Sequence, residues 1–255
     1  MTDRQYVLAE SKWKTVKETD YKAAILPWGA TEAHNYHLPY ATDNIQSDYI
    51  SIESARKAWD KGAKVVVLPC VPFGVNTGQI DIKLCINMNQ STQLALLKDV
   101  TDSLCRQGIL KLVIINSHGG NNFRQIIREV QFYNPKILIT VIDWYKAIDN
   151  NKYFEEPGDH AGEMETSNMF VIAPELVAPL NEAGEGKEKK FKITGLREGW
   201  VWTERKWNKI SEDTGVGNPK KATAEKGKIF LEDLTNSIAD FLVEFEKCDS
   251  DDIYE

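Results

Sequence analysis

The stretch LKLVIINSHGGNNFRQIIREVQFY, residues 110–133, joins an apolar run to an amphipathic segment through a turn with two glycines. Leu, Val and Ile dominate Leu110–Asn116, as in a strand that is buried on both faces. Asn121–Tyr133 has polar residues opposite an apolar stripe, which is typical of a helix that covers a sheet. This strand–turn–helix unit predicts an α/β fold with a mainly parallel sheet.

The same alternation extends on both sides of this unit. Further strands are predicted at Lys22–Trp28, Lys64–Cys70 and Lys136–Asp143, and further helices at Ser47–Lys61 and Gln90–Gln107. We therefore predict three layers, α/β/α, with helices on both faces of a central, mainly parallel sheet. Ligands of such folds bind outside the carboxyl ends of the strands.

The chain of 255 residues is 42% hydrophobic, which is enough for one large core, so a single domain over 1–255 is predicted. The region 181–221 is rich in Gly, Lys and Glu, and it holds Trp200, Trp202 and Trp207 without clean periodicity. We predict an inserted flap there, with a solvated excursion as an equal alternative. A long amphipathic helix is expected near Ala222–Lys247.

The net charge of −7 and the pI near 5.3 argue against a nucleic-acid partner and against an anionic membrane. The N-terminal residues lack the apolar core of a secretory signal, and no apolar stretch approaches the roughly 20 residues of a membrane helix. The four cysteines, Cys70, Cys85, Cys105 and Cys248, form no paired motif. These features predict a soluble, cytoplasmic protein that uses no cysteine in catalysis.

The most polar cluster is TEAHNYHLPYATD, residues 31–43, directly after an apolar strand. Glu32 and His34 stand two residues apart, so an extended chain would point both to one side. Pro39 favours a loop that brings Asp43 back toward them, and a carboxylate can bridge two metal ions. The alternative, with even odds from this motif alone, is a loop of hydrogen-bonded surface residues.

A second cluster, NSHGGN (residues 116–121), places His118 at the carboxyl end of a predicted strand. Gly119 and Gly120 permit a tight turn and a close backbone approach, and Asn121 is a plausible N-cap of the following helix. Alone, this motif is weak, because glycine-rich turns of this kind are common in α/β folds.

The third cluster, DHAGEMETS (residues 159–167), enters a short helix. Its Glu163 and Glu165 are about 200° apart around a helix axis, so we expect only one of them to be a ligand. The three clusters together offer His, Glu and Asp without a thiolate, a mixture that suits zinc, manganese or iron.

The three motifs resemble the creatininase family patterns T-E-x-H-x-x-H-L-P-x-x-T-D, N-G-H-G-G-N and H-A-G-x-x-E-T, in the same order. The resemblance implies a three-layer α/β fold, two divalent metal ions, a small-molecule amide substrate and a homo-oligomer, often a hexamer. It also implies that Glu32, Asp43 and His118 hold one metal. His34 would hold the second, with Asp43 bridging both.

In creatininase itself the second motif resembles N-G-H-x-E-N, and the resemblance implies that its glutamate is a metal ligand. This chain has Gly120 at that position. Glu163 is our candidate replacement, and Glu165 is the less favoured one. Relatives with the Gly-Gly form include formamide hydrolases and peptide-processing enzymes. We therefore predict hydrolysis of a non-peptide or cyclic amide C–N bond, with these two activities as alternatives.

His160 and Glu163 are the predicted catalytic residues. The two metals would lower the pKa of a shared water toward about 7, so that hydroxide attacks the amide. His160 would protonate the leaving nitrogen or, alternatively, only orient Glu163 or a metal ligand. His37 is expected to be a supporting residue. One rival is a non-catalytic small-molecule binding protein of the same fold; a nucleotide-binding protein is disfavoured because no G-x-G-x-x-G motif is present.

Overall fold

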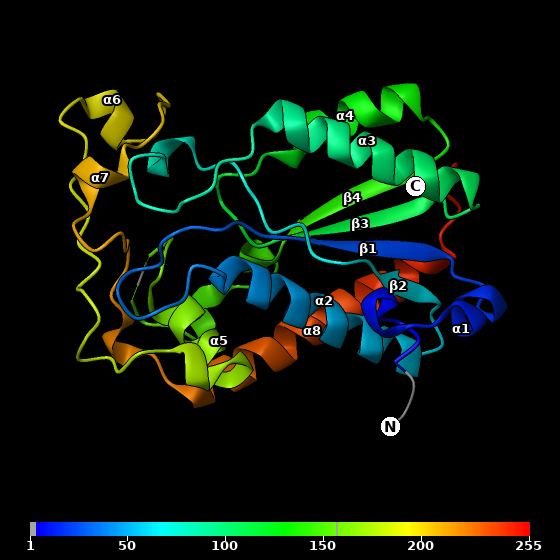
Figure 1. Ribbon diagram of the computed structural model, residues 1–255, viewed down its shortest axis with the longest axis horizontal. Helices are drawn as coiled ribbons and strands as arrows, with labels where there is room; N and C mark the ends of the chain where they lie inside the picture. Colours follow the sequence, from blue (N-terminus) through cyan, green and yellow to red (C-terminus); the bar gives the residue numbers. More distant parts are fainter. Residues whose placement is uncertain (1–3, 157) are drawn as a thin grey trace.

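The computed structural model describes residues 4–156 and 158–255. Its sheet has four strands in the order β2-β1-β3-β4 (Figure 1), and each neighbouring pair is parallel. The strands are β1 (Ala23–Trp28), β2 (Val65–Val67), β3 (Lys111–Asn116) and β4 (Leu138–Asp143). The predicted parallel sheet is confirmed.

Helices cover both faces of the sheet, so the predicted three-layer architecture is confirmed as well. In Figure 1, α3 and α4 lie on one face, and α2, α5 and α8 lie on the other. The α-helices are α1 (Trp13–Glu18), α2 (Thr42–Asp60), α3 (Gln90–Arg106), α4 (Phe123–Tyr133), α5 (Glu163–Ile172), α6 (Thr194–Arg197), α7 (Trp207–Ile210) and α8 (Ala224–Lys247). The short 3₁₀ helices are η1 (Leu8–Glu10), η2 (Thr77–Gln79), η3 (Trp144–Lys146), η4 (Asn150–Lys152), η5 (Pro174–Leu176) and η6 (Pro219–Lys221).

The strands are apolar on both sides because each face has its own core. Along β1, Ala23 and Ile25 belong to the core beneath α2 and α8, whereas Ala24 and Leu26 belong to the core beneath α3 and α4. This division follows from the two-residue repeat of a strand. It explains why the strands appear in the sequence as continuous hydrophobic runs.

Most element boundaries lie within two residues of the sequence-based expectation, and two differ by more. Strand β2 ends at Val67 rather than at Cys70; as the edge strand of the sheet it pairs with β1, and its Val67 also forms an isolated bridge with Val7. Helix α2 begins at Thr42 rather than at Ser47, because the carbonyl of Pro39 accepts hydrogen bonds from both the amide and the hydroxyl of Thr42. Asp43 therefore lies in the first turn of a helix, where the helix dipole favours a carboxylate.

Helix α8 packs closely against α5 at a glycine. A Cβ atom on Gly227 would lie 2.0 Å from the carbonyl oxygen of Ser167 in α5, so any larger residue forces the two helices apart. Helix α8 is also tied to α2, because Nζ of Lys57 donates to the carbonyl of Glu232 and to the hydroxyl of Thr235. These contacts of α8 fix the positions of α5 and of α2, the helix that contains Asp43.

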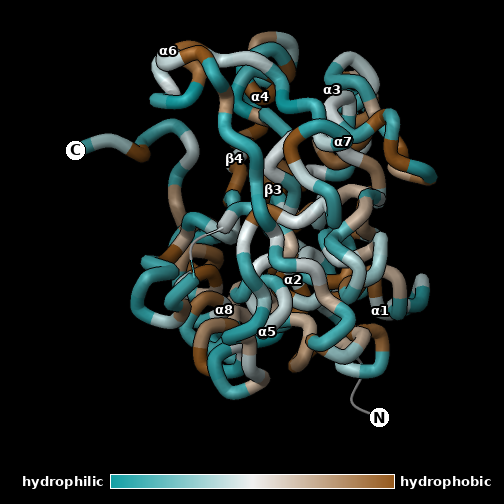
Figure 2. The backbone as a smooth tube through the Cα atoms, turned by 90° about the vertical axis from the view of Figure 1, so that its left-hand side faces the viewer, coloured by the Kyte–Doolittle hydropathy of each residue, from teal (hydrophilic) through white to brown (hydrophobic). Residues whose placement is uncertain are grey.

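The region 181–221, called the insert segment below, lies at the end of the sheet toward which the strands point (Figure 1). Figure 2 views the molecule from this side and shows the segment crossing in front of the strands. The side chain of Asp213 fixes its base, because this buried carboxylate accepts hydrogen bonds from the backbone amides of Gly186 and Gly215. The side chains of Trp200 and Trp202 are exposed. The division into one domain with a flap stays a prediction.

Within the described residues, none of the helices has both the length and the apolar character that crossing a membrane requires.

We predict that Gly227→Ala lowers the free energy of unfolding. Overpacking of a rigid contact costs about 1–3 kcal/mol, whereas alanine gains about 1 kcal/mol in helix propensity. Urea unfolding should therefore show a net loss on the order of 1 kcal/mol, and at most about 2 kcal/mol. Lys228→Ala, at the next and exposed position of α8, is the control and should change stability by less than about 0.5 kcal/mol. A more stable Gly227→Ala protein would contradict the close contact.

Candidate metal centre

Six polar side chains from all three sequence clusters meet at the carboxyl end of the sheet. Glu32 and His34 follow β1, Asp43 lies in the first turn of α2, and His118 follows β3. His160 precedes α5, and Glu165 lies in its first turn. All six are buried, with at most 8% of their surface exposed.

The first group of possible ligands consists of Glu32, Asp43 and His118. Nδ1 of His118 lies 3.0 Å from Oε1 of Glu32 and 3.2 Å from Oδ2 of Asp43. These are three of the residues that the family resemblance implies for one metal.

The second group consists of His34, Asp43 and Glu165. Nε2 of His34 lies 3.2 Å from Oδ1 of Asp43 and 4.0 Å from Oε1 of Glu165. Asp43 thus presents a different oxygen to each group. This is the arrangement expected of a carboxylate that bridges two cations.

His160 lies at the edge of both groups. Its Nδ1 is 3.7 Å from Oε1 of Glu32, and its ring centroid is 4.2 Å from that of His34. It also forms a third possible group with Glu32 and His34. The geometry is compatible with a metal ligand or with a group that handles protons beside the metals.

Backbone carbonyls fix the orientation of all three histidine rings. Nδ1 of His34 lies 3.1 Å from the carbonyl oxygen of Glu32, Nε2 of His118 lies 2.9 Å from that of Val75, and Nε2 of His160 lies 2.7 Å from that of Ala33. In each ring, this nitrogen donates its hydrogen to the carbonyl. The other nitrogen faces carboxylate oxygens, and it needs a proton or a metal cation between itself and those oxygens.

The charges of the cluster are strongly coupled. Burial disfavours a charged His34, but the attraction of Asp43 and a hydrogen bond to it outweigh burial and raise the pKa of His34 to about 10. Glu32 and Asp43 likewise raise the pKa of His118 against the effect of burial. Burial raises the pKa of Glu165 to about 7, and the nearby charge of Asp43 adds to this effect.

His160 and His37 respond to the cluster in the opposite direction. Burial lowers the pKa of His160, and repulsion from His34 adds to this shift. Burial, followed by repulsion from His34, lowers the pKa of His37 to about 4. Nε2 of His37 lies 2.8 Å from the hydroxyl of Thr166 in α5, so this ring links the first motif to the third without reaching the carboxylates.

The donor set fits metal cations. Three carboxylates are buried together, and in the described part of the chain their ion pairs are with histidines, never with Lys or Arg. Oδ2 of Asp43 is buried and lacks a hydrogen bond of normal geometry. Burying a carboxylate without a compensating charge costs several kcal/mol, which a divalent cation would offset. Imidazole and carboxylate together suit zinc, manganese and iron.

The carboxylate of Glu163, the predicted fifth ligand, has partners outside the cluster. Its Oε2 accepts hydrogen bonds from the backbone amides of Glu155 and Glu156, and its Oε1 forms an ion pair with Lys226 of α8. Both oxygens therefore point away from the cluster. Glu165, about half a turn further around α5, reaches the cluster instead, as the helical geometry allows for only one of the pair.

The backbone around Gly120 explains why the second motif has no glutamate there. A Cβ atom at this position would lie 2.3 Å from the carbonyl oxygen of Val75 and 2.5 Å from Nε2 of His118. These two atoms form the hydrogen bond that orients His118. Gly74 likewise leaves room for the same ring, because a Cβ there would lie 2.7 Å from its Cδ2 atom.

Sequence reasoning missed several residues that support the centre. Nε1 of Trp144 donates to the hydroxyl of Ser117, and the carboxylate of Asp143 accepts from the side chain of Asn116. Asn121 is not the N-cap that was expected; its amide donates to Asn116, so it braces the turn instead. An Asp-Trp pair that follows a strand was the available signal for the first two contacts, but it is equally typical of a cap and a packing aromatic.

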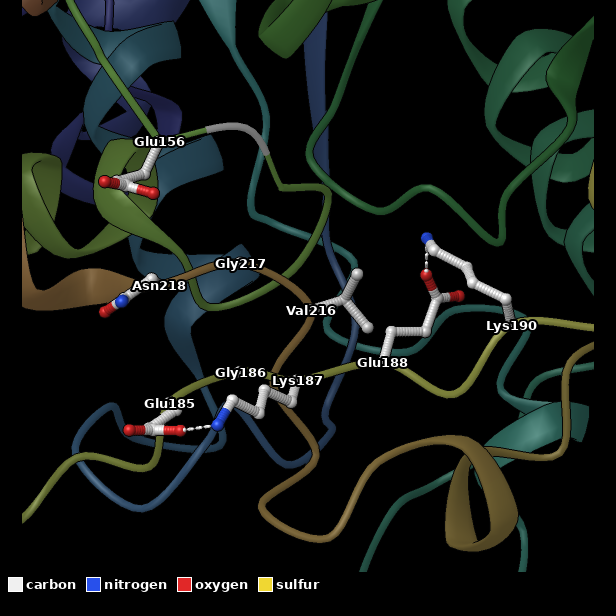
Figure 3. A pocket seen from close by; sticks show the side chains of 9 residues that line it. All are labelled: Glu156, Glu185, Gly186, Lys187, Glu188, Lys190, Val216, Gly217 and Asn218. Atoms are coloured by element: carbon white, nitrogen blue, oxygen red, sulfur yellow. Dashed lines mark hydrogen bonds and ion pairs between the residues drawn. The ribbon is translucent and has the colours of Figure 1, made fainter.

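The insert segment reaches the centre at His160. The ring centroid of Trp207 is 4.7 Å from that of His160, and the backbone of Val216 pairs with the backbone of His160. Val216 also lines a cleft of about 410 Å³ (Figure 3). The other residues that line it are Glu156, Glu185, Gly186, Lys187, Glu188, Lys190, Gly217 and Asn218. The side chains drawn there pair with one another, Glu185 with Lys187 and Glu188 with Lys190.

The fold and the cluster define a three-layer α/β protein with a buried histidine–carboxylate centre. The family model "Creatininase: Creatinine amidohydrolase" matches residues 9–242. The chain therefore belongs to the creatininase family, as the three sequence motifs indicated.

Known proteins agree with this membership. A crystal structure from Bacteroides fragilis NCTC 9343, assigned provisionally as a creatinine amidohydrolase, is 43% identical, covers 100% of both chains and has a TM-score of 0.93. The 2-amino-5-formylamino-6-ribosylaminopyrimidin-4(3H)-one 5'-monophosphate deformylase of Methanothermus fervidus is 30% identical over 81% of this chain and 79% of its own.

The fold extends to creatininase itself. A creatininase variant described as the Zn–Zn type is 20% identical, covers 95% of this chain and 99% of its own, and has a TM-score of 0.80. Family membership and these relatives make the chain a hydrolase that acts on carbon–nitrogen bonds.

We predict that Gly120→Ala weakens metal binding at the group that contains His118. The added Cβ would push the Val75 carbonyl from the ring, and loss of such an orienting contact typically lowers metal affinity about 10–100-fold. Gly119→Ala is the matched control, because no atom lies within 4 Å of a Cβ at that position. Zinc titration against a chelator should separate the two variants. Equal affinities would show that the contact does not matter.

Proposed function

We propose that this chain is a metal-dependent hydrolase of a non-peptide or cyclic amide C–N bond. One observation carries the proposal: the buried rings of His34 and His118 are each fixed by a backbone carbonyl, and each presents its other nitrogen to buried carboxylates. This pattern is typical of metal ligands in proteins, whose rings are oriented by a hydrogen bond on the far nitrogen.

Two divalent ions, zinc, manganese or iron, fit the two groups. Glu32, Asp43 and His118 would hold one ion, as the family resemblance implies. His34 and Glu165 would hold the other, with Asp43 shared. This assignment keeps four of the five predicted ligands and replaces Glu163 by Glu165.

Bound metals of this kind supply a Lewis acid and lower the pKa of a coordinated water to about 7, so that hydroxide can act as the nucleophile. The protein residues supply the rest. Asp43, at the start of α2, holds the two groups at a fixed separation, because each of its oxygens faces one of them. The buried position of all the ligands keeps bulk water from screening their charges.

His160 remains our candidate for proton transfer. Its Nε2 is committed to the carbonyl of Ala33, which leaves Nδ1 facing Glu32 and the two groups. A neutral imidazole in this position can accept a proton from the attacking water and deliver it to the leaving nitrogen, which an amide needs in order to depart. Glu163, by contrast, has no part in this proposal, because its carboxylate is bound to Lys226.

A formamide is the second candidate substrate, and it has its own support. A relative at 30% identity is named as a deformylase, and this chain has the Gly-Gly form of the second motif. Assembly into a homo-oligomer, such as a hexamer, and a cytoplasmic location remain predictions from the sequence.

We predict that wild-type protein purified without chelator contains about two metal ions per subunit and that Asp43→Ala contains almost none. The shared carboxylate belongs to both groups, so its loss should disrupt both. Elemental mass spectrometry measures the ratio.

The same assay distinguishes the two glutamates of α5. Glu165→Gln should lose about one metal, whereas Glu163→Gln should keep both and lose stability instead, because Lys226 would lose one of its two carboxylate partners. A wild-type protein that neither contains nor rebinds metal would sink the proposal. Metal loss in Glu163→Gln alone would restore the original assignment.

We also predict turnover on a panel of small amides that contains cyclic amides and N-formyl compounds. Removing metal with a chelator should abolish release of the amine, and zinc or manganese should restore it. His160→Ala should lower kcat by about 10²–10⁴-fold while both metals stay bound, because general acid–base catalysis contributes about this much. Full turnover by this variant would remove His160 from proton transfer, and metal binding without any turnover would favour a binding protein.

A further inference from the structure

The two carboxylate oxygens of Glu32 have different surroundings. Oε1 faces the ring nitrogens, 3.0 Å from Nδ1 of His118 and 3.7 Å from Nδ1 of His160. Oε2 accepts a hydrogen bond from the side-chain amide of Gln79. Only Oε1 is therefore directed toward the histidines of the centre.

The side chain of Gln79 is itself held in place. It is buried, with 3% of its surface exposed, and it ends the 3₁₀ helix η2. Its carbonyl oxygen, Oε1, accepts from the thiol of Cys85 at 3.4 Å. The two ends of the amide thus have separate partners, and its N–H group is the end that meets the carboxylate.

The insert segment packs on the turn that carries Gln79. A Cβ atom on Gly78 would lie 2.3 Å from the carbonyl oxygen of Arg205, so the two backbones are in close contact. The hydroxyl of Thr77 donates to the carboxylate of Glu204. Nδ2 of Asn208 donates to Asp81 on the same loop. The position of η2 therefore depends on residues about 130 positions further along the chain.

We propose that Gln79 is a positioning residue that ties one oxygen of Glu32 and so leaves the other to bind the metal, and that the insert segment fixes the turn on which it stands. A free carboxylate can bind a cation through one or both oxygens, and a hydrogen bond on one of them selects the first mode. The amide suits this task because it donates a hydrogen bond while Glu32 keeps its full charge. This inference rests on the proposed metal centre.

The test is a Gln79→Met variant, which removes the donor and keeps the size and burial of the side chain. Two quantities are measured for the variant and the wild type: the zinc dissociation constants, by chelator competition, and the unfolding temperature of the metal-free protein. We expect one of the two zinc sites to weaken by about 10–100-fold and the other to change little.

Gln46→Met is the matched control. Gln46 is also buried, but its side-chain oxygen accepts from Asn168, and within the described residues no hydrogen bond joins it to a proposed ligand. Gln46→Met should leave both zinc constants unchanged, whatever it does to the unfolding temperature. A packing role for Gln79 would make the two variants alike in zinc binding, and that result would overturn the proposal.

Gly78→Ala tests the contribution of the insert segment without altering Gln79. The added Cβ would separate η2 from Arg205, so the same zinc site should weaken as in Gln79→Met. Wild-type zinc affinity in Gly78→Ala would overturn the role given to the insert segment. A wild-type protein that binds no zinc would refute the metal centre itself, whereas a zinc-binding wild type with an unaffected Gln79→Met would refute only this inference.

Discussion

The burial of three carboxylates in one cluster is the constraint on which the rest of the site depends. Glu32, Asp43 and Glu165 are nearly inaccessible to water, and like charges in such a medium repel strongly. Among the described residues their ion-pair partners are histidines. The carboxylates raise the pKa values of two of these, His34 and His118. Such a cluster is costly to fold unless cations compensate it, so its existence argues for a purpose beyond stability.

The fold meets this constraint by fixing each side chain from the backbone. Parallel strands bring the segments after β1 and β3 to one edge, and α2 and α5 contribute the carboxylates of Asp43 and Glu165 from their first turns. Carbonyl groups orient the three rings, and glycines at positions 74 and 120 leave the space that the His118 ring and its carbonyl partner need. Rigid elements therefore place the donors, in keeping with a site that must be preorganised.

The insert segment is part of the site rather than an appendage of the surface. Its Trp207 packs on His160, and its backbone at Arg205 presses on the turn that holds Gln79. The base of the insert segment is also bound to the loop that follows β1. In that loop Asn35, next to His34, exchanges side-chain hydrogen bonds with the backbone of Gly184. The exposed Trp200 and Trp202 lie on the same segment, where Nε1 of Trp200 donates to the carboxylate of Glu198.

The sequence by itself determined the parallel α/β layers, because continuous apolar runs and helical stripes are local patterns. It also determined most of the cluster, because these residues follow predicted strands in recognisable motifs. It could not decide between Glu163 and Glu165. Both stand on one helix turn, and only the packing of α5 against α8 shows that Lys226 occupies the first and leaves the second to the centre. The support from Gln79 was also invisible, since a hydrogen bond between residues 47 positions apart leaves no periodic trace in the chain. Such contacts exist only once the tertiary structure has brought distant backbone segments together.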